Sequence, residues 1–255
     1  MHQQFPADSN YRILLQELRG HGKSDRSEAY TKAHFVLDLM HVAASLEIET
    51  FALFGHSLGG HIACRYAALF PEQVKALMVV EGLGPPRRPG LSDDKAKVDR
   101  YRDMMLSRLV RKPSRPVPSV AEVNQRLQAN NPRMTSGAAE HLAPHMVVER
   151  HGSLFWNFDS AANSVFLGTS EEDNEVFWRS IQAPTLLISG TLSYQYWGQQ
   201  MGWDGHFAEG EMEARAAQFQ HADHHWFENS GHMVHYDEPE RLGQLIAKFL
   251  EQNYV

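Results

Sequence analysis

A serine in the sequence GHSLGG is the residue of this chain best suited to act as a nucleophile. Ser57 follows the apolar stretch 51–54 and precedes the helical stretch 62–70. A serine on a sharp turn from a strand into a helix is typical of a nucleophile, because flanking glycines let the backbone hold it in a strained conformation. The N–H of Leu58, at the start of the helix, would then stabilise an oxyanion. The alternative is an ordinary glycine-rich turn.

A serine hydroxyl needs a general base, and His232 is the best candidate among the 15 histidines. It lies on a loop between the apolar stretch 224–227 and the helical stretch 239–252. A base on this loop would reach the edge of the sheet where Ser57 is expected. Four other histidines match no usual metal-ligand spacing, so we expect them to be solvated or hydrogen-bonded and predict no metal site: His221, His224, His225 and His235.

Alternating strand-like and helix-like stretches must position these residues, and they predict an α/β fold with a mostly parallel sheet and helices on both faces. The strand-like stretches are 11–18, 51–54, 76–80, 184–189 and 224–227, and the clearest helical ones are 27–46, 62–70 and 239–252. Between them, residues 85–178 are rich in proline and in amphipathic stretches. We therefore predict an α/β core, residues 1–84 and 179–255, with a mostly helical cap inserted at 85–178.

Composition restricts the class of protein. The 255 residues include 24 basic and 31 acidic side chains, a net charge of -7, which argues against nucleic acid or a membrane surface as the main partner. The first 30 residues show no apolar signal segment, and the single Cys64, which we expect in the core, excludes an intramolecular disulfide. These features predict a cytoplasmic enzyme, monomer or homodimer, that acts on a small molecule.

Four segments resemble the α/β-hydrolase superfamily, in particular its capped esterase-like and epoxide-hydrolase-like members. They are LRGHGKSD at 18–25, GHSLGG at 55–60, FPEQVKALMVVE at 70–81 and SGHMVHYDEPERL at 230–242. The resemblance covers residues 11–84 and 181–252 well and the cap only loosely. It implies an α/β-hydrolase fold with Ser57 as nucleophile, His232 as general base and no cofactor. Haloalkane dehalogenases and epoxide hydrolases of this fold attack with an aspartate, so Ser57 favours an acyl-enzyme route instead.

The same resemblance implies where the triad acid lies. Many members carry it in the loop after the strand matching 184–189, but here the loop 190–197 holds no carboxylate. Another arrangement, similar to part of the haloalkane dehalogenase group, places it directly after the preceding core strand, where this chain has Glu81. The alternative roles of Glu81 are to cap the following loop or to pair with Arg87 or Arg88. The next candidate acids are Asp204 and then Asp159.

The chain departs from the family at its N-terminal end. Family members begin with further strands and a His-Gly loop that supplies a second oxyanion donor, whereas only ten residues precede the stretch 11–18 here. We expect Met1 to be a late start, with roughly 30 to 40 natural residues before it. The alternative is that the sheet closes by direct pairing of 11–18 with 51–54.

The predicted function is hydrolysis of a small-molecule ester, through attack by Ser57, proton transfer by His232 and orientation of His232 by Glu81. We expect Trp156 and Trp197 to contact the substrate, because bulky aromatic residues gather in both regions. Carbon–carbon bond hydrolysis and cofactor-free perhydrolysis use the same triad. A truncated, non-catalytic binding protein is the alternative from another class.

Overall fold

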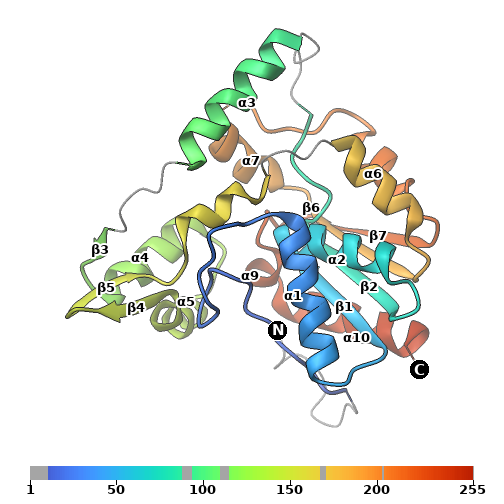
Figure 1. The fold of residues 1–255 in the computed structure, drawn as a ribbon, viewed down its shortest axis with the longest axis horizontal. Helices are drawn as coiled ribbons and strands as arrows, with labels where there is room; N and C mark the ends of the chain where they lie inside the picture. Colours follow the sequence, from blue (N-terminus) through green and yellow to red (C-terminus); the bar gives the residue numbers. More distant parts are fainter. Residues whose placement is uncertain (1–10, 88–93, 110–114, 167–170, 203, 255) are drawn as a thin grey trace. The chain divides into compact units, whose positions relative to one another are not determined.

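The structure is a computed structural model that describes residues 11–87, 94–109, 115–166, 171–202 and 204–254 (Figure 1). These residues form two compact units. The first takes in residues 11–13, 39–87, 171–202 and 204–254, and the second takes in 14–38, 94–109 and 115–166. Among the described residues, no helix is long and apolar enough to cross a membrane. Ser57, Leu58, Glu81 and His232 all lie in the first unit.

A parallel four-stranded sheet forms the centre of the first unit. Its strands are β1 (Phe51–His56), β2 (Val74–Val80), β6 (Thr185–Gly190) and β7 (Ala222–Phe227), in the order β1-β2-β6-β7. Every residue of β6 is buried, as expected for a strand covered on both faces. The predicted strands from residue 51 onward are thus confirmed, with no bound shifted by more than two residues.

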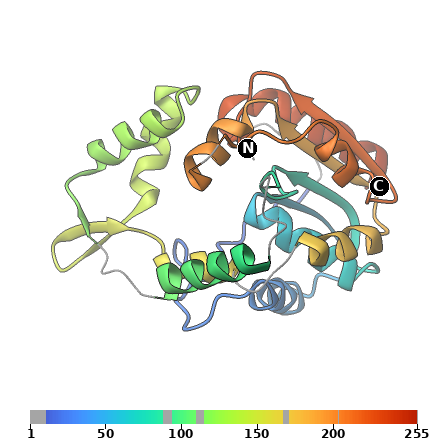
Figure 2. The ribbon, with the colours of Figure 1, turned by 90° about the horizontal axis from the view of Figure 1, so that it is seen from above.

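Helices cover the two faces of this sheet (Figure 2). One face carries α10 (Pro239–Asn253), whose buried Leu242, Ile246 and Leu250 pack in one cluster with β2 and β6. The other face carries α2 (Leu58–Leu69), which contacts β1 and β2. The remaining helices of the first unit are α6 (Glu171–Ser180), α7 (Ser193–Met201), α8 (Glu211–Ala216) and α9 (Val234–Asp237). The predicted sheet with helices on both faces is therefore confirmed.

The prediction of a strand at Tyr11–Leu18 is wrong. The structure gives this segment no strand, and the exposed fractions of Ile13, Leu14 and Leu15 reach 40%, 47% and 73%. A strand needs a neighbour for its N–H and C=O groups, and within the described residues β1 pairs only with β2. Direct pairing of 11–18 with 51–54 is therefore not observed, and the predicted late start at Met1 lies outside the described residues.

The second unit contains a small antiparallel sheet as well as helices. The sheet has the order β3-β5-β4 and consists of β3 (Pro116–Val117), β4 (Val147–Arg150) and β5 (Ser153–Trp156). Its helices are α3 (Asp94–Leu109), α4 (Val120–Asn130), α5 (Ser136–Leu142), η2 (Ala143–Met146) and η3 (Ser160–Phe166). The side chains of Ser119 and Thr135 cap α4 and α5, which explains where these helices begin.

The units do not share the boundaries of the predicted core and cap. Residues 14–38 belong to the second unit, and the boundary between the units falls inside α1 (Lys32–Ser45). Residues 171–178, which we assigned to the cap, belong to the first unit, where α6 packs against α2. The assignment of 85–178 to a cap stays a prediction.

Candidate active site

Ser57 lies on a strained turn between β1 and α2. Its backbone has φ 52° and ψ -116°, a conformation that costs a non-glycine residue about 1–3 kcal/mol. The turn is so tight that a Cβ at Gly55 would lie only 2.2 Å from the carbonyl oxygen of Gly59. The Ser57 N–H donates to the carbonyl of Val80 at 2.9 Å, which fixes the turn to the end of β2. The hydroxyl of Ser57 is thereby held at the carboxyl edge of the sheet.

The imidazole of His232 joins Ser57 to a carboxylate. His232 lies between β7 and α9 and is only 4% exposed. Its Nε2 lies 3.0 Å from Ser57 Oγ, and its Nδ1 lies 3.0 Å from Glu81 Oε2. A carboxylate accepts hydrogen bonds, so Nδ1 carries the proton and Nε2 is left free to accept the proton of Ser57.

Glu81 directly follows β2 and has a positive φ of 53°. It is 8% exposed, and its Oε1 accepts a hydrogen bond from the Gly190 N–H at 2.6 Å. The next residue, Gly82, leaves no room for a side chain, since a Cβ there would lie 2.5 Å from Val79 Cγ1. A buried carboxylate with two fixed donors is held in one orientation, and its second oxygen faces the imidazole of His232.

Two histidines and two aromatic residues surround His232. The Nε2–H of His56 donates to the backbone carbonyl of His232 at 2.7 Å, and the His56 and His235 rings lie 4.5 Å apart. Burial, and secondarily the proximity of His232, lower the pKa of His56 to about 4, so His56 is neutral at pH 7. From α7, Tyr196 stacks on His232 with ring centroids 4.0 Å apart, and Trp197 approaches it edge-on at 5.0 Å.

The first N–H groups of α2 are available to an oxyanion. Leu58 is the first residue of α2, and the first four N–H groups of an α-helix have no acceptor within the helix. The positive end of the helix dipole adds to their attraction for negative charge. Leu58 thus begins α2 directly after Ser57, and its role as an oxyanion donor stays a prediction.

Comparison with known proteins identifies the family of this chain. The alpha/beta hydrolase fold family matches the sequence over residues 3–239. The chain belongs to this family. The sequence is 22% identical to a serine hydrolase-like protein of Danio rerio over 95% of this chain and 74% of the relative. It is 25% identical to the sn-1-specific diacylglycerol lipase ABHD11 of Danio rerio over 94% of this chain and 69% of the relative.

The fold of this alpha/beta hydrolase also resembles solved structures. One is the thioesterase domain from the curacin biosynthetic pathway, with a TM-score of 0.71 and 22% sequence identity over 90% of this chain and 79% of that domain. Another is E-2-(acetamidomethylene)succinate hydrolase, with a TM-score of 0.70 and 19% identity over 92% of this chain and 80% of that chain. The predicted α/β-hydrolase fold is thus confirmed.

The other candidate acids of this alpha/beta hydrolase have different partners. Asp204 is exposed and lies 2.7 Å from His206, and Asp159 belongs to the second unit, where it accepts a hydrogen bond from Tyr30 at 2.9 Å. Arg87, a suggested partner of Glu81, forms an ion pair with Glu175 at 2.9 Å. Arg88 lies outside the described residues. Only Glu81, among the three candidate acids, contacts the imidazole of His232 in the structure.

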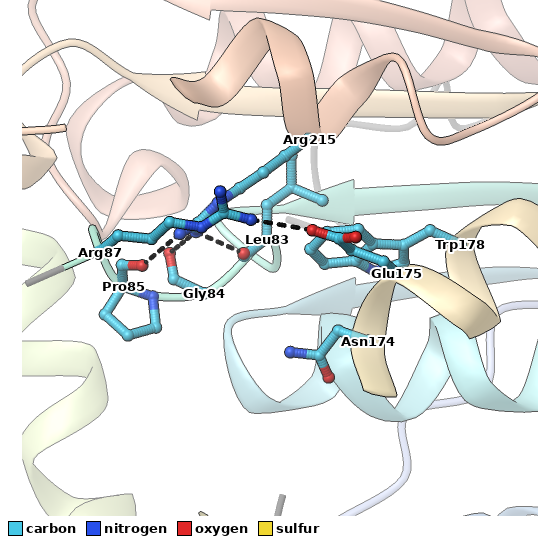
Figure 3. A pocket seen from close by; sticks show the side chains of 8 residues that line it. All are labelled: Leu83, Gly84, Pro85, Arg87, Asn174, Glu175, Trp178 and Arg215. Atoms are coloured by element: carbon cyan, nitrogen blue, oxygen red, sulfur yellow. Dashed lines mark hydrogen bonds and ion pairs between the residues drawn. The ribbon is translucent and has the colours of Figure 1, made fainter. Parts of the chain in front are cut away.

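A hollow beside the loop after Glu81 has Arg87, Glu175 and Arg215 in its lining, and Arg87 pairs with Glu175 there (Figure 3). The guanidinium of Arg215 donates to the carbonyls of Leu83, Gly84 and Pro85 at 2.8–3.1 Å, and it pairs with the buried Glu211 at 2.6 Å. This network attaches the loop to α8. It therefore supports the backbone that continues from Glu81.

The two predicted substrate contacts lie in different units. Trp197 belongs to α7 beside His232, and its indole Nε1 is buried with no hydrogen-bond partner among the described residues. Trp156 ends β5 in the second unit. Their roles in binding stay predictions. Cys64 is buried, as expected, with its pKa raised to about 12 by burial, and no cluster of metal-ligating side chains occurs in the described part of the chain.

Sequence reasoning did not single out His56 or Tyr196. His56 occupies a variable position of the serine motif, and its type gave no sign that it would hold the backbone of His232. Tyr196 lies in an aromatic segment, but only the register of α7 decides which ring stacks on the imidazole. The proximity of His56 to Ser57 in the sequence was the one signal that could have drawn attention to it.

Proposed function

We propose that this protein is a serine hydrolase that cleaves a small-molecule carboxylic ester through an acyl-enzyme. One observation carries the proposal: a continuous line of hydrogen bonds runs from Ser57 Oγ through both nitrogens of His232 to Glu81. Each contact measures 3.0 Å, and the serine lies on a strained turn at the start of a helix. A nucleophile, a general base and an orienting acid are thereby in contact.

The proposed reaction begins with attack of Ser57 Oγ on the ester carbonyl carbon. As the new C–O bond forms, the serine proton moves to His232 Nε2 and the carbonyl π electrons move to oxygen. The tetrahedral intermediate collapses, and the departing alcohol takes the proton from His232. Water then attacks the acyl-enzyme in the same way, releasing the carboxylic acid and restoring Ser57. These steps need no metal or organic cofactor.

Glu81 and Leu58 stabilise the charges that develop in this sequence. The carboxylate of Glu81 faces Nδ1 of His232 and stabilises the imidazolium that exists after proton transfer. The Leu58 N–H, at the N-terminus of α2, donates to the oxyanion. One oxyanion donor of this kind contributes about 10²–10³ to kcat.

The choice of an ester rests on chemistry and on relatives together. A neutral serine–histidine pair attacks carbonyl carbon. One relative, which matches 94% of this chain, is named a diacylglycerol lipase, and a lipase cleaves an ester. We therefore propose carboxylic esters as the substrate class. We also propose that Trp156 and Trp197 contact the substrate.

Hydrolysis of p-nitrophenyl esters with acyl chains of increasing length tests the proposal. The wild-type protein should release p-nitrophenol, and Ser57→Ala should lose the activity. Ser189→Ala is the matched control, because Ser189 Oγ also lies 3.0 Å from a histidine, His224, whose ring forms no hydrogen bond with a carboxylate among the described residues. Ser189→Ala should keep the wild-type rate. Equal activity of Ser57→Ala and wild-type protein would contradict the proposal.

A further inference from the structure

The imidazole of His232 presents one face to an aromatic ring. The ring centroids of Tyr196 and His232 lie 4.0 Å apart, and the ring planes differ by only 10°. Trp197 lies 5.0 Å from the same imidazole with its ring plane at 65°, so these two rings are not stacked. Tyr196 is therefore the aromatic residue of α7 whose π face covers His232.

This geometry favours the protonated imidazole over the neutral one. Neutral aromatic pairs prefer edge-to-face or offset arrangements with centroids about 4.5–7 Å apart. A cation, in contrast, is attracted to the face of an aromatic ring when it lies within about 6 Å of the centroid. A parallel ring at 4.0 Å thus gains most when His232 becomes charged, and this occurs as Ser57 is deprotonated.

Other charged and titratable groups face His232 as well. Glu81, at the end of β2, contacts Nδ1, and its negative charge also favours the imidazolium. The ring of His56, on β1, lies 5.1 Å from that of His232, and the His235 ring, on α9, contacts His56; burial lowers the pKa of both, so that they are neutral at pH 7. Tyr196, whose pKa burial raises, is neutral too. The π face is thus the second attractive group for an imidazolium at this position.

We propose that Tyr196 is a positioning residue of the serine hydrolase: its π face stabilises the charged His232 during attack and holds the imidazole in line with Ser57 and Glu81. The inference rests on the proposed function, in which His232 takes the proton of Ser57 and so becomes charged. An interaction that strengthens in the transition state raises the rate of the chemical step and leaves the affinity for the reagent unchanged. The expected contribution is about tenfold.

An alkyl fluorophosphonate separates these effects, because its reaction consists of one binding step and one attack. Ser57 Oγ forms a bond to phosphorus, fluoride leaves, and the serine proton moves to His232. The measured constants are KI for binding and kinact for attack. We expect Tyr196→Phe, which keeps the ring, to retain the wild-type kinact, and Tyr196→Leu to lower kinact about tenfold with KI within about twofold.

A stacking pair elsewhere on α7 supplies the matched control. Tyr194 stacks on His206 with centroids 4.0 Å apart and planes 16° apart, and His206 is exposed and paired with Asp204. Tyr194→Leu therefore removes a similar stacking contact of the same helix, one made with a histidine other than His232. It should leave kinact and KI at the wild-type values.

Replacing Tyr196 by pentafluorophenylalanine tests the charge attraction itself, because fluorination reverses the charge of the ring face but preserves its shape. Under the proposal the pentafluorophenylalanine variant has a lower kinact than Tyr196→Phe, by about the same factor as Tyr196→Leu. The comparison with Tyr196→Phe stands even if the leucine variant fails to fold. A pentafluorophenylalanine variant as fast as Tyr196→Phe would overturn the inference, and so would a folded Tyr196→Leu with the wild-type kinact. If the wild-type protein does not react at all, the proposed function fails instead.

Discussion

Glutamine in place of Glu81 should disable His232 without removing it. The amide offers one acceptor oxygen and one NH₂ donor, whereas the carboxylate offers two acceptors. The Gly190 N–H lies 2.6 Å from Oε1 of Glu81 and needs an acceptor there, so the amide oxygen of glutamine takes that position. The NH₂ group then takes the position of Oε2 and faces His232 Nδ1. His232 must then accept at Nδ1 and carry its proton on Nε2. In this tautomer it cannot take the proton of Ser57.

The expected magnitude follows from the tautomer. Loss of the correct imidazole tautomer in a serine triad lowers kcat by about 10⁴, and we expect a decrease of about 10³–10⁴ for Glu81→Gln. The KM should change little, because Glu81 is buried behind His232 and accepts hydrogen bonds from the protein itself. The assay is steady-state hydrolysis of the best p-nitrophenyl ester, with circular dichroism as a check of folding.

A second carboxylate near the base provides the control. Glu238 accepts a hydrogen bond from the Ser230 hydroxyl at 2.7 Å, and glutamine at that position can still accept it. Glu238→Gln should therefore keep activity within about threefold of wild type. If folded Glu81→Gln retained more than about a tenth of the wild-type kcat, the orienting role of Glu81 would be refuted.

Three further predictions concern the backbone, a buried ion pair and a partly buried histidine. Gly55→Ala should abolish fluorophosphonate labelling, since its Cβ would lie 2.2 Å from a carbonyl oxygen, whereas Gly59→Ala, whose Cβ meets nothing within 4 Å, should fold and be labelled. Arg215→Met should lower the free energy of unfolding by about 3–5 kcal/mol in urea titrations, because it leaves a buried carboxylate unpaired. Arg126→Met, which removes an exposed pair, should change it by less than about 0.5 kcal/mol, and equal losses in the two variants would show that burial is not the cause. The pKa of His56 is lowered to about 4, mainly by burial, so below pH 6.5 the unfolded chain binds a proton that the folded chain does not bind. The free energy of unfolding should thus fall by up to about 1.4 kcal/mol for each pH unit as the pH drops from 6.5 toward 4. His56→Gln should lose this part of the pH dependence. An unchanged pH dependence in His56→Gln would contradict the assignment.

The sequence was most informative where local pattern and burial agree. The apolar runs of β2 and β6 predicted buried parallel strands, and the glycines around Ser57 predicted a tight turn whose strained φ is observed. The stretch 11–18 carried a comparable apolar pattern, but a strand forms only when its backbone groups find partners. The apolar sequence pattern indicates which secondary structure a segment prefers, whereas strand pairing depends on which segments lie beside it.

The sequence predicted the candidate site only in part, for a similar reason. Glu81 followed from family resemblance, while its contact with the Gly190 N–H depends on how β2 and β6 align in the sheet. Tyr196 became visible only through the position of α7 relative to the loop of His232. Residues that act through a neighbour, unlike a nucleophile in a motif, leave no spacing signal in the chain.

The mass of the intact protein after reaction with a fluorophosphonate tests the central claim most directly. The account predicts one phosphonyl group per chain, located by peptide mapping on Ser57, with no label on Ser57→Ala and slow labelling of His232→Gln. A folded wild-type chain that takes up no label, or that carries it on another residue, would contradict the proposal that Ser57 is a nucleophile activated by His232.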